Sequence, residues 1–317
     1  MDLHGKTIDC HTHVGLFLKS LFDDKYPASG DVINLIERMD LHHVDYSIVF
    51  PFPDYYTQGD KTLYEKMMLI IGDTPYKYTN ERMITEIEQL NISRLLPFFM
   101  FSINYAIDAQ IEYMSKYAET KKIFGLKYYP DSDMRKVDDL LKDGSEFIDF
   151  LIKYNLPLVI HCSEGASTNS NGFSNPLDMI CIAENNPKLR LCIAHMGQFN
   201  KELIDIIRTK KLNNVYLDTS PILHLCNVRI INGLKNCLDL DYSDPLEVIK
   251  KMHELLPNNI IWGTDYPYTY TCNLNNEIHN KDFSRFSYNE YYNLFNKIPV
   301  EIKERISNKN TIKFLFG

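Results

Sequence analysis

The sequence lacks an excess of basic residues. Its 317 residues include 34 Lys and Arg against 42 Asp and Glu, which gives a formal net charge of −8 at pH 7. A nucleic-acid surface or a polybasic membrane patch needs clustered Lys and Arg, so this charge balance argues against both kinds of partner. We therefore expect a small-molecule substrate, and we leave a homodimer open.

Long apolar runs are also absent. No uninterrupted apolar stretch approaches the ~20 residues that cross a bilayer, and residues 1–6 lack the basic start and apolar segment of a signal peptide. Cys-x-x-Cys pairs are missing too, although the chain has seven cysteines, an odd number. We expect a cytoplasmic protein whose cysteines are reduced, with Cys10, Cys162 and Cys192 buried as small hydrophobic residues.

Short apolar runs, by contrast, recur along the whole chain and alternate with helical patterns. Each run has the length and apolar character of a buried strand in a parallel sheet. Eight such strands with helices between them fit a single α/β domain, a (β/α)8 TIM-type barrel over residues 1–317, better than two separate domains. The predicted strands are 8–15, 44–52, 95–101, 123–130, 156–161, 189–195, 215–218 and 260–265, and the predicted helices are 31–43, 81–90, 106–120, 137–154, 177–185, 202–210 and 245–256.

A long polar and aromatic segment, 53–80, follows the second predicted strand and contains a helix-like patch at 63–71. Loops of this length usually have a function. Because a loop that follows a barrel strand leaves from the C-terminal end of the barrel, where catalysis takes place, we expect this insertion to lie over the mouth and shape the pocket.

Two histidines one residue apart end the first predicted strand. Alternate side chains of a strand point to the same face, so His11 and His13 project together. His161 ends the fifth strand and Asp265 the eighth, and all strand ends of a parallel barrel meet in one mouth. Imidazole and carboxylate groups suit divalent ions, so these four residues are predicted to bind one ion, zinc first, with manganese, iron(II) or cobalt as alternatives.

The predicted catalytic residues are Asp265 and His195. Water bound to such an ion becomes acidic enough to act as hydroxide near neutral pH. Asp265 can bind the ion through one oxygen and accept the water proton through the other. His195 ends the sixth strand, so it is placed to donate a proton, to polarise a substrate oxygen or to bind a second metal.

Three further polar residues are predicted near the mouth, where they bind substrate or a second metal. Lys127 ends the fourth strand and can hold an anionic substrate group, or pair with Glu164 or Asp265. Glu164 follows His161 and either orients a ligand or faces solvent. His224 comes after the seventh strand and lines the mouth.

The strand-end motifs resemble those of the amidohydrolase superfamily. The closest resemblance is to the amidohydrolase-related (amidohydrolase 2) branch, which includes zinc decarboxylases of the aminocarboxymuconate semialdehyde type. The resemblance implies a metal-dependent (β/α)8 barrel with the roles given above, and residues 310–316 resemble the closing helix of that branch. In binuclear members a carbamylated lysine at the position of Lys127 bridges two metals. The motifs are Ile-Asp-Cys-His-Thr-His at 8–13, Val-Ile-His at 159–161, Ile-Ala-His-Met-Gly at 193–197 and Trp-Gly-Thr-Asp-Tyr-Pro at 262–267.

Three functions fit these residues. A hydrolase would direct the activated water at an amide, ester or lactone of a small molecule, with Asp265 as base and His195 steadying the oxyanion. A non-oxidative zinc-dependent decarboxylase of an aromatic or unsaturated acid needs a cation for the departing carboxylate. No arginine occurs in residues 51–56 after the second strand, which favours hydrolysis, although Arg229 or Lys127 could serve. The third function is a non-catalytic metal-binding barrel.

Overall fold

One sheet runs through the computed structural model, which describes residues 2–16, 29–52, 72, 74–163, 172–232, 237–267 and 286–317. Within these residues the sheet has nine strands, and eight of them are parallel and neighbour one another in chain order. The other strand, β2 (Ser29–Gly30), is antiparallel to the first. The parallel strands are β1 (Ile8–Leu16), β3 (Tyr46–Pro51), β4 (Leu95–Phe101), β5 (Gly125–Tyr128), β6 (Leu158–Ile160), β7 (Leu191–Ile193), β8 (Val215–Asp218) and β9 (Ile260–Ile261).

Backbone hydrogen bonds join the last strand to the first. The Cys10 N–H donates to the Trp262 carbonyl at 2.8 Å, and the Asp265 N–H donates to the His11 carbonyl at 2.8 Å. A parallel bridge between Thr12 and Tyr266 extends this contact. The sheet therefore curls round on itself, and the predicted (β/α)8 TIM-type fold is confirmed.

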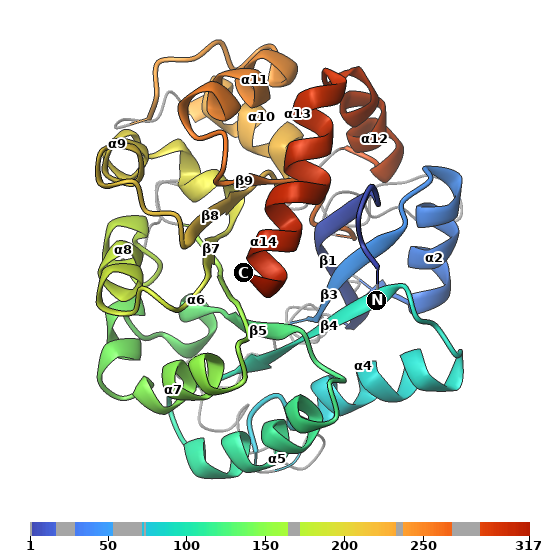
Figure 1. Ribbon diagram of the computed structural model, residues 1–317, viewed down its shortest axis with the longest axis vertical. Helices are drawn as coiled ribbons and strands as arrows, with labels where there is room; N and C mark the ends of the chain where they lie inside the picture. The colour runs from blue at the N-terminus through green and yellow to red at the C-terminus, as the bar shows by residue number, and fades with distance from the viewer. Residues whose placement is uncertain are drawn as a thin grey trace.

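Helices follow most of the strands and surround the sheet (Figure 1). Six of the predicted helices are present with ends shifted by up to four residues. These are α2 (Val32–Leu41), α4 (Lys77–Gln89), α5 (Ile107–Glu119), α8 (Pro176–Asn185), α9 (Lys201–Lys210) and α11 (Pro245–Leu255). The sequence analysis did not predict α6 (Pro130–Asp133), α10 (Ile222–Asn232), α12 (Tyr288–Lys297) or α13 (Val300–Glu304), and the helix-like patch at 63–71 lies outside the described residues.

The predicted helix 137–154 is wrong as a single element. It is divided into a 3-10 helix, η1 (Val137–Leu141), and α7 (Ser145–Lys153). Gly144 lies between them, where the backbone comes so close to its neighbours that a Cβ atom would be 2.7 Å from Cγ2 of Ile103. A glycine at this close contact therefore separates two elements in a segment whose apolar spacing alone predicts one helix.

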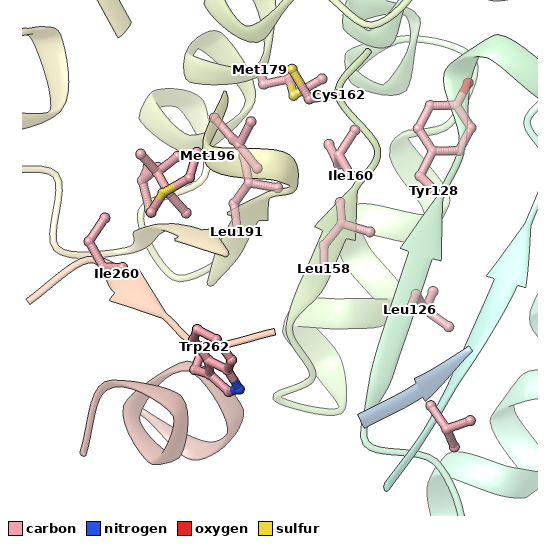
Figure 2. Packing of buried hydrophobic residues seen from close by; sticks show 14 of the residues in the cluster. Leu126, Tyr128, Leu158, Ile160, Cys162, Met179, Leu191, Met196, Ile260 and Trp262 are labelled. Atoms are coloured by element: carbon pink, nitrogen blue, oxygen red, sulfur yellow. The ribbon is translucent and has the colours of Figure 1, made fainter. Parts of the chain in front are cut away.

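Apolar side chains fill two separate regions. On β6, Val159 faces the interior of the barrel, whereas Leu158 and Ile160 face the surrounding helices, as the alternation of a strand requires. Figure 2 shows part of the region between the strands and the surrounding helices. The six described cysteines are free, and Cys10, Cys162 and Cys192 are buried, as predicted. Among the described helices none is long and apolar enough to cross a membrane.

The C-terminal helix α14 (Asn310–Phe316) covers one end of the barrel and lies inside the ring of strands in Figure 1. Phe314 and Leu315 pack into the barrel interior. Arg190, just before β7, donates to the Phe314 carbonyl at 2.7 Å and to the Leu315 carbonyl at 3.1 Å. Because this contact closes the end at which β7 begins, the site must open at the other end, where the strands finish.

Candidate active site

Polar side chains gather at the C-terminal ends of the strands. His11 and His13 come from β1, Lys127 from β5 and Asp218 from β8, while others lie one to four residues after the end of a strand. All of them are buried or nearly so, although such residues are normally exposed. The residues that follow a strand are His161 after β6, His195 after β7 and Asp265 after β9.

Three of the four predicted metal ligands converge. Nε2 of His11 and Nε2 of His13 each lie 3.4 Å from Oδ1 of Asp265. These three residues form one of two groups of His and Asp residues, in the described part of the chain, whose ligand atoms lie within 4.8 Å of one another. The geometry thus provides two nitrogens and one carboxylate for a single ion.

His161 lies beside this group. Its Nδ1 is 3.0 Å from Nε2 of His195, and its ring centroid is 3.9 Å from that of Tyr129. His195 in turn lies between His161 and His11, with its ring centroid 5.2 Å from that of His11. The role of His161 as the fourth ligand therefore remains a prediction.

The hydrogen bonds of His11 and His13 fix which nitrogen carries the proton. Nδ1 of His11 donates to Oδ2 of Asp218 at 2.9 Å, and Nδ1 of His13 donates to the Pro51 carbonyl at 3.2 Å. Both Nε2 atoms then keep their lone pairs and face Asp265. Burial lowers the pKa of His11 to about 4 and also lowers that of His13, so both imidazoles are neutral at pH 7, as metal ligation requires.

The same reasoning applies to His195 and His161. Nδ1 of His195 lies 2.7 Å from the Ser220 carbonyl, which only accepts, so this nitrogen carries the proton. Nε2 of His195 is then an acceptor for the Nδ1–H of His161, and His161 keeps its lone pair on Nε2. Burial lowers the pKa of His161 well below its usual value.

Asp218 is a site residue that the sequence analysis missed. Its carboxylate accepts from His11 Nδ1, from the His195 N–H at 3.0 Å and from the Ser220 hydroxyl at 2.5 Å. Burial opposes its ionisation, but His11, which donates a hydrogen bond to it, holds the pKa of Asp218 well below its usual range. The second potential metal group consists of His11, His195 and Asp218. The position of Asp218 at the end of a predicted strand could have revealed this residue from the sequence, because the other site residues also lie at strand ends.

The chain turns sharply at His195. Residues His195–Phe199 form a 3-10 helix, η2, in the left-handed region, with φ between 52° and 59°. This region costs a residue other than glycine roughly 1–2 kcal/mol, so the turn is a strained segment next to the site. The bond from the His195 N–H to Asp218 helps to hold it.

Two of the three further predicted residues lie near this centre. Nζ of Lys127 is 3.3 Å from Nε2 of His11 and 4.9 Å from the centroid of the Phe50 ring, and burial lowers the pKa of Lys127. His224 is half-buried on α10, and burial lowers the pKa of its imidazole by more than the nearby charge of Asp265 raises it. Glu164 lies outside the described residues.

Fold and site together define a class of protein, the (β/α)8 barrels with histidine and aspartate groups at their strand ends that can hold a divalent ion. Within this class the chain belongs to the amidohydrolase family (Amidohydro_2), which its sequence matches over residues 8–317. The resemblance indicated by the strand-end motifs is thereby confirmed. No curated protein matches the chain.

Solved structures with the same fold are similar to nearly the whole chain. One is 5-carboxyvanillate decarboxylase from Sphingomonas paucimobilis, with 14% identity, coverage of 99% of both chains and a TM-score of 0.63. Another is a probable 2-pyrone-4,6-dicarboxylic acid hydrolase from Acinetobacter baumannii, with 15% identity, coverage of 98% of this chain and 99% of that one, and a TM-score of 0.59. A third is an amidohydrolase from Burkholderia multivorans with bound zinc, with 12% identity, coverage of 99% and 100%, and a TM-score of 0.62. The family and these neighbours are enzymes.

Proposed function

We propose that the protein is a metal-dependent hydrolase that acts on an amide, ester or lactone of a small molecule. The observation that carries this proposal is the convergence of two histidine lone pairs on one carboxylate, with His11 Nε2 and His13 Nε2 both 3.4 Å from Asp265 Oδ1. Neutral imidazoles and an ionised carboxylate are the protonation states that a divalent ion requires. The donor set thus fits an ion without any change of protonation.

His11, His13 and Asp265 would hold the ion, with His161 as the fourth ligand. Zinc is the first choice because nitrogen and oxygen ligands suit it and because the similar amidohydrolase from Burkholderia multivorans contains it. When bound, the ion would supply an acidified water and a Lewis acid for a substrate oxygen.

The remaining steps belong to Asp265 and His195. Oδ1 of Asp265 faces the two imidazoles, so its second oxygen is the base for the water proton. Nδ1 of His195 is committed to the Ser220 carbonyl, so His195 would exchange a proton at Nε2, which then gives up the hydrogen bond that it accepts from His161. Both groups come from strand ends, where the barrel holds them in place.

A second candidate function is the non-oxidative decarboxylation of a small carboxylic acid. Arg229, one candidate cation, donates to the carbonyl of Gln198 at 2.6 Å and to its Oε1 at 3.0 Å, so its guanidinium is directed at Gln198. Lys127 favours this function, because its buried ammonium lies 3.3 Å from His11 Nε2. The similarity to 5-carboxyvanillate decarboxylase supports it as well.

The test is a substrate panel on protein loaded with zinc, manganese or cobalt. Esters, lactones, amides and aryl carboxylates should be offered, including compounds that carry a second carboxylate. Hydrolysis that a chelator abolishes and added zinc restores is the expected result. Release of carbon dioxide would favour the decarboxylase, and metal-replete protein that converts no compound would favour the non-catalytic barrel.

A further inference from the structure

Asp9 has a fully buried carboxyl group and lies two residues before His11. One of its oxygens, Oδ1, accepts the backbone N–H of His11 at 3.2 Å and the backbone N–H of Thr264 at 3.1 Å. Thr264 directly precedes Asp265, and the two donors, His11 and Thr264, are far apart in the chain. A single oxygen atom thus links the backbone beside two ligands of the proposed metal.

The other oxygen, Oδ2, receives hydroxyl groups. Thr264 Oγ1 donates at 2.8 Å, while the hydroxyl groups of Tyr292 and Tyr288 on α12 donate at 3.3 Å and 3.5 Å. Asp9 therefore connects three elements, β1, the segment after β9 and α12. Because these bonds cross-link separate elements, they restrict movement of one against another.

The backbone around Asp9 explains why such a link is needed. Strand β1 carries one extra residue relative to β3 between Asp9 and Thr12, so the regular ladder is interrupted at Cys10 and His11. A buried N–H without an acceptor costs about 1–3 kcal/mol, and Asp9 supplies the acceptor for His11. Asp265 is also irregular, with a φ of 67°, which a residue other than glycine rarely adopts.

We propose that Asp9 is a positioning residue for the metal centre, because it holds the backbone of β1 and of residues 263–265 at the separation at which His11 and Asp265 share one ion. Asp9 itself faces α12 and does not belong to either potential metal group. This inference rests on the proposed metal-dependent function.

Three variants test this role, with wild-type protein as reference. Asp9→Ala removes both oxygens and should weaken metal affinity about 10–100-fold, the usual effect of losing a group that orients ligands. Asp9→Asn keeps one oxygen as an acceptor for the two N–H groups and should restore most of the affinity. Asp133→Ala is the matched control, because Asp133 is also buried and also accepts a backbone N–H, from Ile103 at 2.8 Å, yet belongs to neither potential metal group.

Two quantities should be measured on each protein. These are the free energy of unfolding of the metal-free form in urea and the dissociation constants for zinc and cobalt, from competition with a chromogenic chelator. A purely structural role would lower the free energy of unfolding of Asp9→Ala and Asp133→Ala alike and leave both affinities at the wild-type value. A positioning role lowers the affinity of Asp9→Ala alone.

The outcomes separate this inference from the proposed function. Wild-type affinity in folded Asp9→Ala overturns the positioning role and leaves the metal-dependent function intact. Wild-type protein that binds neither ion overturns both. If Asp9→Ala does not fold, Thr264→Val takes its place, because it removes the hydroxyl that donates to Oδ2 and accepts the Tyr266 N–H but leaves both backbone bonds to Oδ1. That variant should show a smaller loss of affinity, and an unchanged affinity would contradict the proposal.

Discussion

The imidazole of His11 has a carboxylate on each side. Asp218 accepts the proton of Nδ1 at 2.9 Å, and Asp265 lies 3.4 Å from Nε2. The first contact makes Nε2 the more basic nitrogen, and the second provides an anionic ligand beside it. Lys127, 3.3 Å from the same Nε2, balances part of this negative charge.

His195→Asn tests the division of roles at the centre. Since His11, His13, His161 and Asp265 are the proposed ligands, the variant should keep close to one ion per chain. Its turnover should fall by roughly 10²–10⁴, the range for a lost general acid or base. Elemental analysis beside the rate on an active substrate checks both values.

A binuclear site would give a different result for His195→Asn. Wild type would then carry two ions per chain and the variant one, because His195 belongs to the second potential metal group. That result would show that His195 is a ligand, and the assignment of Nε2 as a proton site would be wrong.

Asp133 should make stability depend on pH. Burial raises the pKa of Asp133 to about 7, against a hydrogen bond from the Ile103 N–H. Between about pH 4 and 7 the folded protein therefore keeps a proton that the unfolded chain releases, so stability falls as the pH rises, by up to about 1.4 kcal/mol per unit. Asp133→Asn should remove this contribution.

Urea unfolding of wild type and Asp133→Asn across this pH range gives the measurement. As the pH rises, the free energy of unfolding of Asp133→Asn should increase relative to that of wild type. Replacement of the exposed Asp149 by Asn is the control and should retain the wild-type slope. Parallel curves for wild type and Asp133→Asn would contradict the expectation.

At the scale of elements, the left-handed turn η2 places His195 and depends on Gly197. Gly197 has a φ of 52°, and a Cβ atom there would lie 2.2 Å from Cδ2 of Leu203 on α9. Gly197→Ala should therefore combine conformational strain with overlap and lower the free energy of unfolding by about 2–4 kcal/mol.

Gly5→Ala is the matched control for this change. Gly5 also has a positive φ, 71°, but a Cβ atom there meets nothing within 4 Å, so only the conformational cost of roughly 1–2 kcal/mol should appear. Denaturation in urea compares the two variants. Equal losses would mean that the Leu203 side chain shifts to accept the new methyl group.

The insertion 53–80 belongs to the same scale. Residues 53–71 lie outside the described part of the chain, so its place over the mouth remains a prediction that rests on its departure from the C-terminal end of β3. Deletion of its tip should change the order of substrate preference while metal content stays the same. Loss of metal on deletion would show that the segment contributes a ligand or supports one.

For the whole molecule, local patterns were sufficient to predict the barrel. Each strand is a short apolar run, and alternation with helices allows few other arrangements. The same geometry predicted the meeting of His11, His13 and Asp265, because side chains at parallel strand ends converge whatever the loops do. The break in helix 137–154 was missed although Gly144, a residue that disfavours a helix interior, stands within it; the close approach of Gly144 to Ile103, 41 positions away in the chain, could not be predicted.

Side-chain detail was beyond the sequence for a related reason. Nδ1 of His161 lies beside His195 and His161 belongs to neither potential metal group, an arrangement that depends on side-chain torsions that only the packed neighbours determine. The strand-end position of Asp218 was visible in the sequence, but its role depends on contacts with His11 and the His195 N–H, which come from other strands. The sequence analysis also missed α12, whose Tyr292 donates to Asp9, because this helix does not follow closely after a predicted strand.

The joining of β1 to the segment after β9 also determines the order of events during synthesis. Asp9 and Thr264 are 255 positions apart. At ~5–20 residues per second, His11 and His13 leave the ribosome roughly 10–50 s before Asp265 exists. During that interval the two histidines form an incomplete chelating pair on a strand whose last neighbour has not yet been made. The helix α14, which fills the far end of the barrel, is translated later still, so that end closes only after all the proposed ligands have been made.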